Sequence, residues 1–248
     1  MTDHRRAQAE QAFVLHSHPY RETSLLLETF TRPYGRVTMV ARGARRPRSA
    51  LRGLLLSFQP LTLGWFGKGE VRTLSRAEWN GGQALLAGEA LLCGFYMNEL
   101  LLRLLPREDA HEVLFGRYQQ ALLALSRREA SASVLRSFEK ALLAELGYAM
   151  TLDRDGATGR MLDPDATYTY DPERGPLELA DSVDHGAVPE PLLRGRVLLD
   201  IAHDDYRDPE TLAQAKALMR LLINHRLENK PLRSRRVFRE LLELQPSS

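Results

Sequence analysis

Residues 61–74, LTLGWFGKGEVRTL, decide the fold of the first third of this 248-residue chain. Two β-prone runs, Leu61–Phe66 and Val71–Leu74, flank the triplet Gly67-Lys68-Gly69, which is typical of a hairpin turn. Upstream, three more β-prone runs are separated by turn residues and cover 12–17, 23–30 and 35–41. About five short strands without long helices between them predict a small barrel or sandwich.

After these strands the apolar residues recur at helical spacing. A first helix is expected to end at Pro106. A second is expected over about 109–125, with Asp109 as its N-cap. A third is expected over about 133–146, and the glycine that follows is typical of a helix C-terminus.

The next part of the chain, about residues 150–190, holds repeated Asp, Gly and Pro with little apolar periodicity. It is predicted to be a loop-rich acidic insert with at most a hairpin around Tyr168–Tyr170. Asp208-Pro209 then favours the start of a strong helix to about Leu227, with the aspartate as cap. A last short helix is expected over about 234–244.

The composition is that of a globular protein, with 44% hydrophobic and 27% charged residues. The predicted fold is α+β: a β module over residues 1–80 and a helical domain over 81–248. The single cysteine, Cys93, lies in an apolar run and favours core packing, so no disulfide or multi-cysteine metal site is expected. No apolar run is long enough to span a membrane, and the polar residues 1–6 predict no secretory signal. We therefore expect a cytoplasmic protein.

Charge is unevenly distributed along the chain. Residues 1–80 carry a net charge of +7 and residues 213–248 carry +5, whereas residues 150–212 carry −9. Two basic ends that flank an acidic middle indicate a polyanionic partner for the ends.

Catalytic signatures are absent from the sequence, so neither an enzyme activity nor a cofactor is predicted. There is no Walker A loop, no H-E-x-x-H and no G-x-S-x-G motif. One cluster offers a metal-dependent hydrolase as an alternative, because its side chains are ligands that suit Mg²⁺ or Mn²⁺: Asp200, His203, Asp204 and Asp205. A solvated turn before the next helix accounts for the same residues, and no metal is predicted there.

The strongest functional signal is a window without any carboxylate, between Glu28 and Glu70. It is rich in arginine, and its Gly- and Pro-containing stretch 42–52 is predicted to be a mobile loop. Four aromatic residues are interleaved with the charges: Tyr34, Phe58, Trp65 and Phe66. Arginines with aromatic stacking platforms on a small barrel hold single-stranded nucleic acid without reading its sequence. The predicted nucleic-acid contacts here are Arg32, Tyr34, Arg36, Arg42, Arg45, Arg46, Arg48, Arg52 and Lys68.

Two further features lie in the helical half. A second basic patch around Pro231 suits an extension of the nucleic-acid footprint or another acidic partner, and it contains Arg226, Lys230, Arg233, Arg235, Arg236 and Arg239. Arg233, Arg235 and Arg236 are predicted DNA contacts. Arginines on segments whose other faces are apolar suit an acidic peptide that ends in a hydrophobic residue. The candidate residues for such a peptide are Arg128, Leu135, Arg136 and Phe138.

Several short motifs also occur in a fixed order along the chain. They are AFVLHSHPYRETS at 12–24, GRV at 35–37, VARGAR at 40–45, GEV at 69–71, YMNELL at 96–101, RSFE at 136–139 and LGY at 146–148. Together they resemble the RecO family of bacterial recombination mediators and DNA repair proteins. The similarity covers residues 12–148 closely and the C-terminal helices, including KPLRSR at 230–235, more loosely.

This resemblance implies an N-terminal five-stranded OB-fold, a helical domain and no bond-breaking chemistry. Proteins of the family bind single- and double-stranded DNA, anneal complementary strands and act with RecR to load RecA onto DNA covered by single-stranded-DNA-binding protein (SSB). They bind the acidic C-terminal tail of SSB through the helical domain, where Arg136, beside Leu135 and Phe138, is the expected contact. They work in the cytoplasm at the nucleoid. Some relatives carry a four-cysteine zinc site, which is not expected in a chain with only Cys93.

Other interpretations stay open. An OB-fold RNA-binding protein would use the same arginines and aromatic groove, and would prefer RNA to DNA of equal length. An adaptor would hold protein partners and touch no DNA.

Overall fold

The computed structural model describes residues 6–147, 150–179 and 191–243. The chain divides into two compact units. The first comprises residues 1–131 and 232–248, and the second comprises residues 132–231. The helices expected in one domain over 81–248 are therefore shared between the two units.

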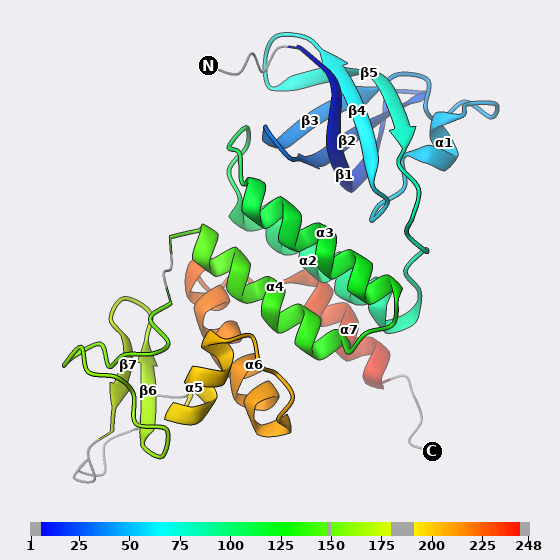
Figure 1. The fold of residues 1–248 in the computed structure, drawn as a ribbon. Helices are drawn as coiled ribbons and strands as arrows, with labels where there is room; N and C mark the ends of the chain where they lie inside the picture. Colours follow the sequence, from blue (N-terminus) through cyan, green and yellow to red (C-terminus); the bar gives the residue numbers. More distant parts are fainter. Residues whose placement is uncertain (1–5, 148–149, 180–190, 244–248) are drawn as a thin grey trace. The chain divides into compact units, whose positions relative to one another are not determined.

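The first unit begins with a closed barrel, as predicted. Its strands are β1 (Arg6–Tyr20), β2 (Ser24–Thr31), β3 (Gly35–Ala41), β4 (Leu61–Phe66) and β5 (Val71–Trp79). They close in the order β1-β2-β3-β5-β4, and all neighbouring pairs are antiparallel except β3 and β5 (Figure 1). A five-stranded barrel whose long first strand pairs with both β2 and β4 is consistent with an OB-fold.

The barrel closes around alternating apolar side chains. On β3, Val37, Met39 and Ala41 point into the core, and on β4, Leu63 and Trp65 do so. On β3, Thr38 and Val40 point to the other face of the strand, as strand geometry requires, and Thr38 is buried there as well.

Besides the barrel and the short helix α1 (Leu51–Leu54), the described residues of the first unit form the helices α2 (Gly88–Leu104), α3 (Glu112–Ser126) and α7 (Arg233–Glu243). Cys93 is buried in α2, which confirms its core position. The prediction that Asp109 caps α3 is wrong. The helix begins at Glu112, after His111, because the backbone N–H of Glu108 donates to the carbonyl of Arg36 at 2.9 Å and keeps this segment beside β3.

A buried network of hydrogen bonds joins helices α2 and α3 to strand β1. The Asn98 side chain on α2 donates to the Leu15 carbonyl at 2.7 Å, and the Tyr118 hydroxyl on α3 donates to Asn98 Oδ1 at 2.5 Å. Burial raises the pKa of Tyr118, so the hydroxyl keeps its proton. Each buried polar group of this network therefore has a partner.

Removing the Tyr118 hydroxyl is expected to destabilise the first unit. Tyr118→Phe leaves the buried Asn98 oxygen without its donor, which costs about 1–3 kcal/mol of unfolding free energy. Urea unfolding checks this, with Tyr20→Phe, a partly exposed tyrosine on β1, as the control. An unchanged unfolding midpoint in Tyr118→Phe would show that Asn98 finds another donor.

The second unit holds helices and a small sheet. Its elements are α4 (Ser131–Glu145), β6 (Thr167–Asp171), β7 (Gly175–Glu178), β8 (Leu193–Arg194), α5 (Gly195–Ala202) and α6 (Pro209–Arg226). The hairpin expected around Tyr168–Tyr170 is present as β6–β7, and β8 adds a third strand to it. The last part of the acidic insert, residues 180–190, lies outside the described residues. Asp208 caps α6 as predicted, accepting from the Glu210 N–H at 2.8 Å.

One buried carboxylate organises the turn that precedes this sheet. Asp155 Oδ1 accepts from the N–H groups of Ala157 and Thr158 and from the Thr158 hydroxyl, and Oδ2 accepts from the Glu178 N–H on β7. Burial raises the pKa of Asp155, but the hydrogen bonds outweigh it and leave the pKa below its ordinary value. Asp155 thus ties the turn to β7.

This carboxylate makes the second unit sensitive to acid. Because the pKa of Asp155 is lowered on folding, its stabilisation is full above the ordinary aspartate range and is lost as pH falls through the lowered value. Asp155→Asn is expected to cost about 1–3 kcal/mol at pH 7 and to remove this acid dependence. Hydrogen exchange at the Thr158 and Glu178 amides, followed as a function of pH, measures the local stability. Asp165→Asn, at an exposed position, is the control. Equal protection in both variants would contradict the role of Asp155.

Candidate nucleic-acid interface

The stretch from Arg42 to Arg52, here called the arginine segment, connects β3 to the short helix α1 (Leu51–Leu54). Its backbone folds into consecutive turns. The N–H of Arg46 donates to the carbonyl of Gly43 at 3.1 Å, and that of Ser49 donates to Arg46 at 3.0 Å. The segment predicted as a mobile loop is therefore a series of hydrogen-bonded turns that ends in one helical turn.

All five arginine side chains of this segment are exposed: Arg42, Arg45, Arg46, Arg48 and Arg52. Within the described part of the chain, four of them form no ion pair: Arg42, Arg46, Arg48 and Arg52. Guanidinium groups bind phosphate oxygens bidentately. The arginine segment therefore offers four free cations to a polyanion.

Arg45 holds the segment in place. Its guanidinium donates to the carbonyls of Arg21 and Glu22 at 3.3 Å each, and its backbone N–H donates to Thr23 at 2.8 Å. The arginine segment consequently lies against the β1–β2 turn. In OB-folds this turn borders the surface that binds oligonucleotides.

Arg36 is not placed to contact a nucleic acid, contrary to the prediction. It is 8% exposed, and its guanidinium donates to the carbonyls of Leu102 and Leu105 at 2.7 and 2.8 Å and pairs with Glu28 at 3.3 Å. Burial lowers the pKa of Arg36, and Glu28 opposes that shift. The side chain satisfies free carbonyls at the C-terminus of α2, where a cation is favourable.

The predicted stacking aromatics are mostly in the core. Tyr34 is 7% exposed and meets the buried Trp65 edge to face, with ring centroids 5.3 Å apart. Phe58 is also buried, so of the four interleaved aromatics only Phe66 is exposed. Tyr34 is therefore corrected from a DNA contact to a core residue. Sequence reasoning missed a different exposed aromatic, Trp79, although a tryptophan among polar neighbours in RAEWNGG is itself a signal.

The two remaining predicted contacts of the barrel are exposed but lie on other turns. Arg32 follows β2, at the opposite end of β3 from the arginine segment, where it donates to Gln11 Oε1 at 3.1 Å and lies 3.8 Å from Glu112. Lys68 lies in the β4–β5 turn. An exposed ion pair such as Arg32–Glu112 contributes little and yields readily to another anion.

Comparison with known proteins decides the family. The family model described as "Recombination protein O N terminal" matches residues 6–82, and "Recombination protein O C terminal" matches residues 85–236. The chain is 54% identical over 240 residues to the DNA repair protein RecO of Dechloromonas aromatica, covering 95% of this chain and 97% of that protein. It is also 54% identical over 244 residues to the DNA repair protein RecO of Aromatoleum aromaticum, covering 98% and 100%. The chain belongs to the RecO family.

The second basic patch of this RecO family member is split between the units. Arg226 and Lys230 belong to the second unit, whereas the α7 residues Arg233, Arg235 and Arg236 belong to the first. Arg233 is exposed, and Arg236 is 3.5 Å from Glu240. Arg235 lies over the Tyr96 ring, 5.6 Å from its centroid, and donates to its hydroxyl at 3.2 Å. The side chain of Arg239 lies outside the described residues.

The N-terminus of α7 is held by a carboxylate on α2. Glu99 accepts from the N–H groups of Arg233 and Ser234 at 2.9 and 2.8 Å and from the Ser234 hydroxyl at 2.7 Å. Burial raises the pKa of Glu99, but these hydrogen bonds and Arg103 bring it below its ordinary value. Glu99 therefore fixes the position from which the α7 arginines project.

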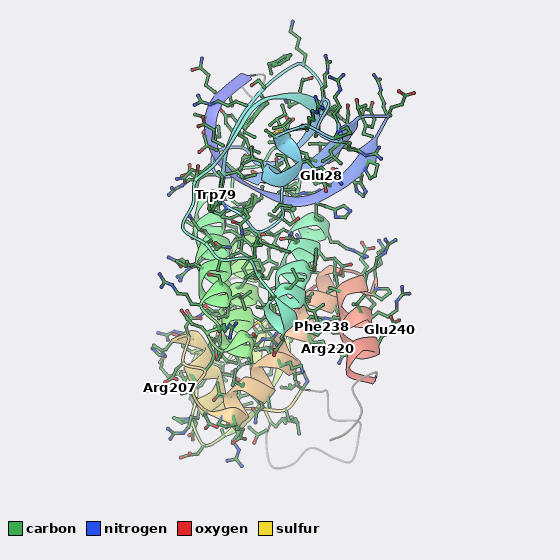
Figure 2. The ribbon with its side chains drawn as sticks, turned by 90° about the vertical axis from the view of Figure 1, so that its right-hand side faces the viewer. Glu28, Trp79, Arg207, Arg220, Phe238 and Glu240 are labelled. Atoms are coloured by element: carbon green, nitrogen blue, oxygen red, sulfur yellow. The ribbon has the colours of Figure 1, made fainter. Side chains whose placement is uncertain are left out.

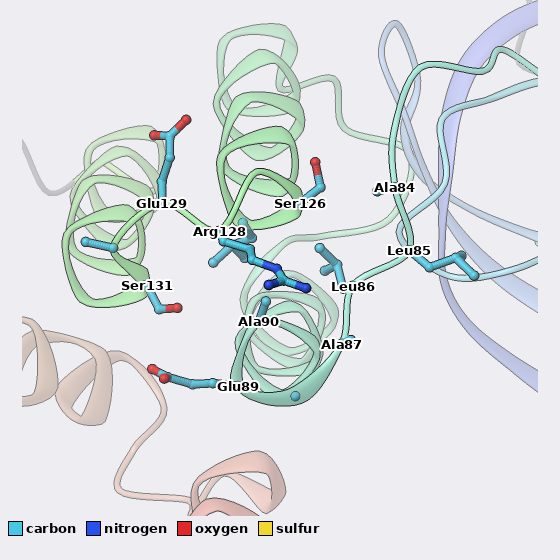
Figure 3. A pocket seen from close by; sticks show the side chains of 13 residues that line it. Ala84, Leu85, Leu86, Ala87, Glu89, Ala90, Ser126, Arg128, Glu129 and Ser131 are labelled. Atoms are coloured by element: carbon cyan, nitrogen blue, oxygen red, sulfur yellow. The ribbon is translucent and has the colours of Figure 1, made fainter.

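The residues predicted for the SSB tail are also divided. Arg136 is 8% exposed and pairs with Glu139 at 2.9 Å on α4, Phe138 is buried and Leu135 is partly buried. Arg128 belongs to the first unit and is exposed. Figure 3 shows the Arg128 side chain extending into a cavity of about 630 Å³. This cavity is lined by residues 84–90, 125–126 and 128–131. The tail-binding role of these four residues stays a prediction.

The carboxylates of the alternative metal cluster each have a partner. Asp200 accepts from the Thr211 hydroxyl at 2.9 Å, and Asp204 pairs with Lys140 at 2.9 Å. Hydrogen bonds from Arg207 lower the pKa of Asp205 to about 2. No three His, Cys, Asp or Glu side chains gather as metal ligands in residues 6–147, 150–179 and 191–243. Among those residues, too, no helix combines the length and apolar character that a membrane span requires.

Proposed function

We propose that this protein is a recombination mediator in DNA repair, which binds single- and double-stranded DNA without sequence preference and anneals complementary strands. The observation that carries the proposal is the set of four exposed, unpaired arginines beside the β1–β2 turn of a five-stranded barrel. Membership of the RecO family, whose compared members are DNA repair proteins, supports the same role.

The chemistry suits annealing more than sequence recognition. Arginines on turns neutralise phosphates, which lowers the repulsion between two strands, and they carry no information about the bases. A scaffold of this kind brings complementary strands together and leaves base pairing to select the partner. Annealing breaks no covalent bond, so the proposed role needs neither a catalytic residue nor a cofactor.

The partners follow from the family resemblance. We propose that the protein acts with RecR, that it binds the acidic tail of SSB, and that together with RecR it helps to load RecA onto SSB-coated single strands. This work takes place in the cytoplasm at the nucleoid. The acidic character of residues 150–212 would keep DNA on the basic surfaces, since like charges repel.

Annealing of complementary oligonucleotides, bare or coated with SSB, tests the proposal. We expect the protein to accelerate annealing of both and to do so less as salt rises, because phosphate contacts release counterions. DNA and RNA strands of equal length are compared in parallel. No acceleration at any salt would favour the adaptor, and a clear preference for RNA would favour an RNA-binding protein.

A further inference from the structure

Apart from Phe66, the exposed aromatic rings in the described part of the first unit are not the ones that the sequence suggests. Trp65 is 1% exposed, whereas Trp79 is 57% and Phe95 46% exposed. Both lie beyond the carboxylate-free window, Trp79 at the end of β5 and Phe95 on α2. Aromatic rings that are open to solvent are the platforms on which unpaired nucleic-acid bases stack.

Trp79 is held in a defined position while its ring stays open to solvent. The indole N–H donates to Gln59 Oε1 at 3.1 Å, and Gln59 is itself buried. The polar edge of the ring is thereby satisfied, as is usual for tryptophan at binding surfaces. A ring that is fixed before binding loses little conformational entropy when a partner packs on it.

The support around Trp79 is tightly packed. Phe95 meets Phe58 edge to face, with ring centroids 5.1 Å apart, and the Gln83 side chain donates to the Phe58 carbonyl at 2.6 Å. A Cβ at Gly94 would lie 2.9 Å from both Phe58 and Leu86, so α2 approaches this segment as closely as a glycine allows. Trp79 is thus linked through Gln59 to the neighbouring Phe58, which packs on α2, and residues 58–59, 79 and 94–95 are here called the aromatic shelf.

This shelf lies on the side of the barrel that carries α1. Helix α1, which bears Arg52, contacts β5, and Figure 1 shows it beside the end of that strand. Figure 2 looks onto α1 and labels Trp79 on the same side, where the barrel meets the helices. An open aromatic ring and a run of unpaired arginines thus share one side of the first unit.

We propose that Trp79 is a base-stacking site for single-stranded nucleic acid whose phosphates are bound by the arginine segment. The inference rests on the proposed function and adds the residue on which the bases stack. Nucleic-acid bases stack on tryptophan whatever their identity, and the neighbouring guanidinium groups favour a partner that combines flat rings with negative charge. Because bases inside a duplex are already stacked on each other, Trp79 stacks only with the bases of single strands.

Tryptophan fluorescence tests this directly, because the chain has two tryptophans and one of them is buried. Titration with a dT oligonucleotide is expected to quench the fluorescence of the full-length protein, whereas a blunt duplex that binds equally well leaves it unchanged. The Trp79→Phe variant, which keeps Trp65 as its only tryptophan, is expected to bind the oligonucleotide without quenching.

Affinity measurements separate stacking from charge. Trp79→Ala is expected to weaken binding of the dT oligonucleotide about tenfold with an unchanged salt slope, and Trp79→Phe is expected to restore most of it. Val113→Ala, which alters an exposed apolar residue on α3, is the control and should bind normally. Far-UV circular dichroism and the urea midpoint show whether Trp79→Ala still folds.

Each remaining outcome contradicts the inference in a distinguishable way. Binding to DNA without quenching, with normal affinity in Trp79→Ala, would retain the proposed function and show that Trp79 takes no part in it. Quenching by duplex as strongly as by single strand would exclude stacking on unpaired bases. No binding of any nucleic acid by the intact protein would overturn the proposed function and this site together, and would favour a protein partner for the shelf.

Discussion

Replacing Arg46, Arg48 and Arg52 with glutamate is expected to weaken binding of single-stranded DNA about 100-fold at 0.1 M salt. On a single strand each phosphate contact contributes a slope of about −0.7 to the plot of log affinity against log salt. At 0.1 M salt, relative to 1 M, one contact therefore raises the affinity about fivefold. Loss of three contacts should lower the steepness of that slope by about 2 and slow annealing in parallel. Fluorescence anisotropy over a salt series measures both quantities.

A matched variant separates local contacts from overall charge. Arg160, Arg174 and Arg196 are exposed arginines of the second unit, and their replacement by glutamate changes the net charge by the same amount. This variant is expected to keep most of its affinity. Equal losses in the two triple variants would mean that net charge alone drives binding. Full affinity in the arginine-segment variant would assign the phosphate contacts to other cations, with Arg233 on α7 the first to examine. Arg45 is left intact in this design because it holds the segment on the β1–β2 turn.

The largest expected effect on stability comes from Gly35→Ala. Gly35 begins β3 with a φ of 62°, and a Cβ built there would lie 1.7 Å from the carbonyl oxygen of Asp109. A side chain at this position is strained because the backbone is left-handed. It also collides with a backbone atom that cannot move without disturbing the segment that leads into α3. The two costs together are expected to lower the unfolding free energy by about 2–5 kcal/mol, measured by urea unfolding.

Gly81→Ala is the control for backbone strain alone. Its φ of 74° is similar, and a Cβ there would meet nothing within 4 Å. Its expected cost is about 1–2 kcal/mol. If the two variants lose the same stability, the contact with Asp109 relaxes freely and the junction of barrel and helices is softer than its geometry indicates.

Local patterns predicted the elements whose boundaries depend on local chemistry. Strands β3 and β4 have the expected bounds because their apolar and β-branched residues stop at turn residues. The start of α6 was predictable because Asp208-Pro209 supplies both a cap and a preset φ. The first part of β1 was missed, since residues 6–11 are mostly polar and become a strand by pairing with β4.

Tertiary contacts decided the features that the sequence could not predict. Arg36 and Arg46 are the same residue type in the same carboxylate-free window, yet Arg36 ends among carbonyls of α2, 66 to 69 residues away, and Arg46 remains exposed. Tyr34 and Trp79 differ in the same way: one faces the barrel core and the other faces solvent. Composition identified a basic surface with aromatic residues, but only the fold shows which of them a ligand can reach.

The hydrogen bonds between Glu99 and the N-terminus of α7 also affect the order in which the protein folds during its synthesis. Glu99 leaves the ribosome long before its partners Arg233 and Ser234, which lie 134 and 135 residues further along the chain. At 5–20 residues per second, that interval is roughly 7–27 s. During this time the Glu99 carboxylate has Arg103 of its own helix as a partner, but α2 lacks the helix that covers it. The barrel consists of residues 6–79 and can close early, whereas the unit that contains it is completed only after α7 has been translated.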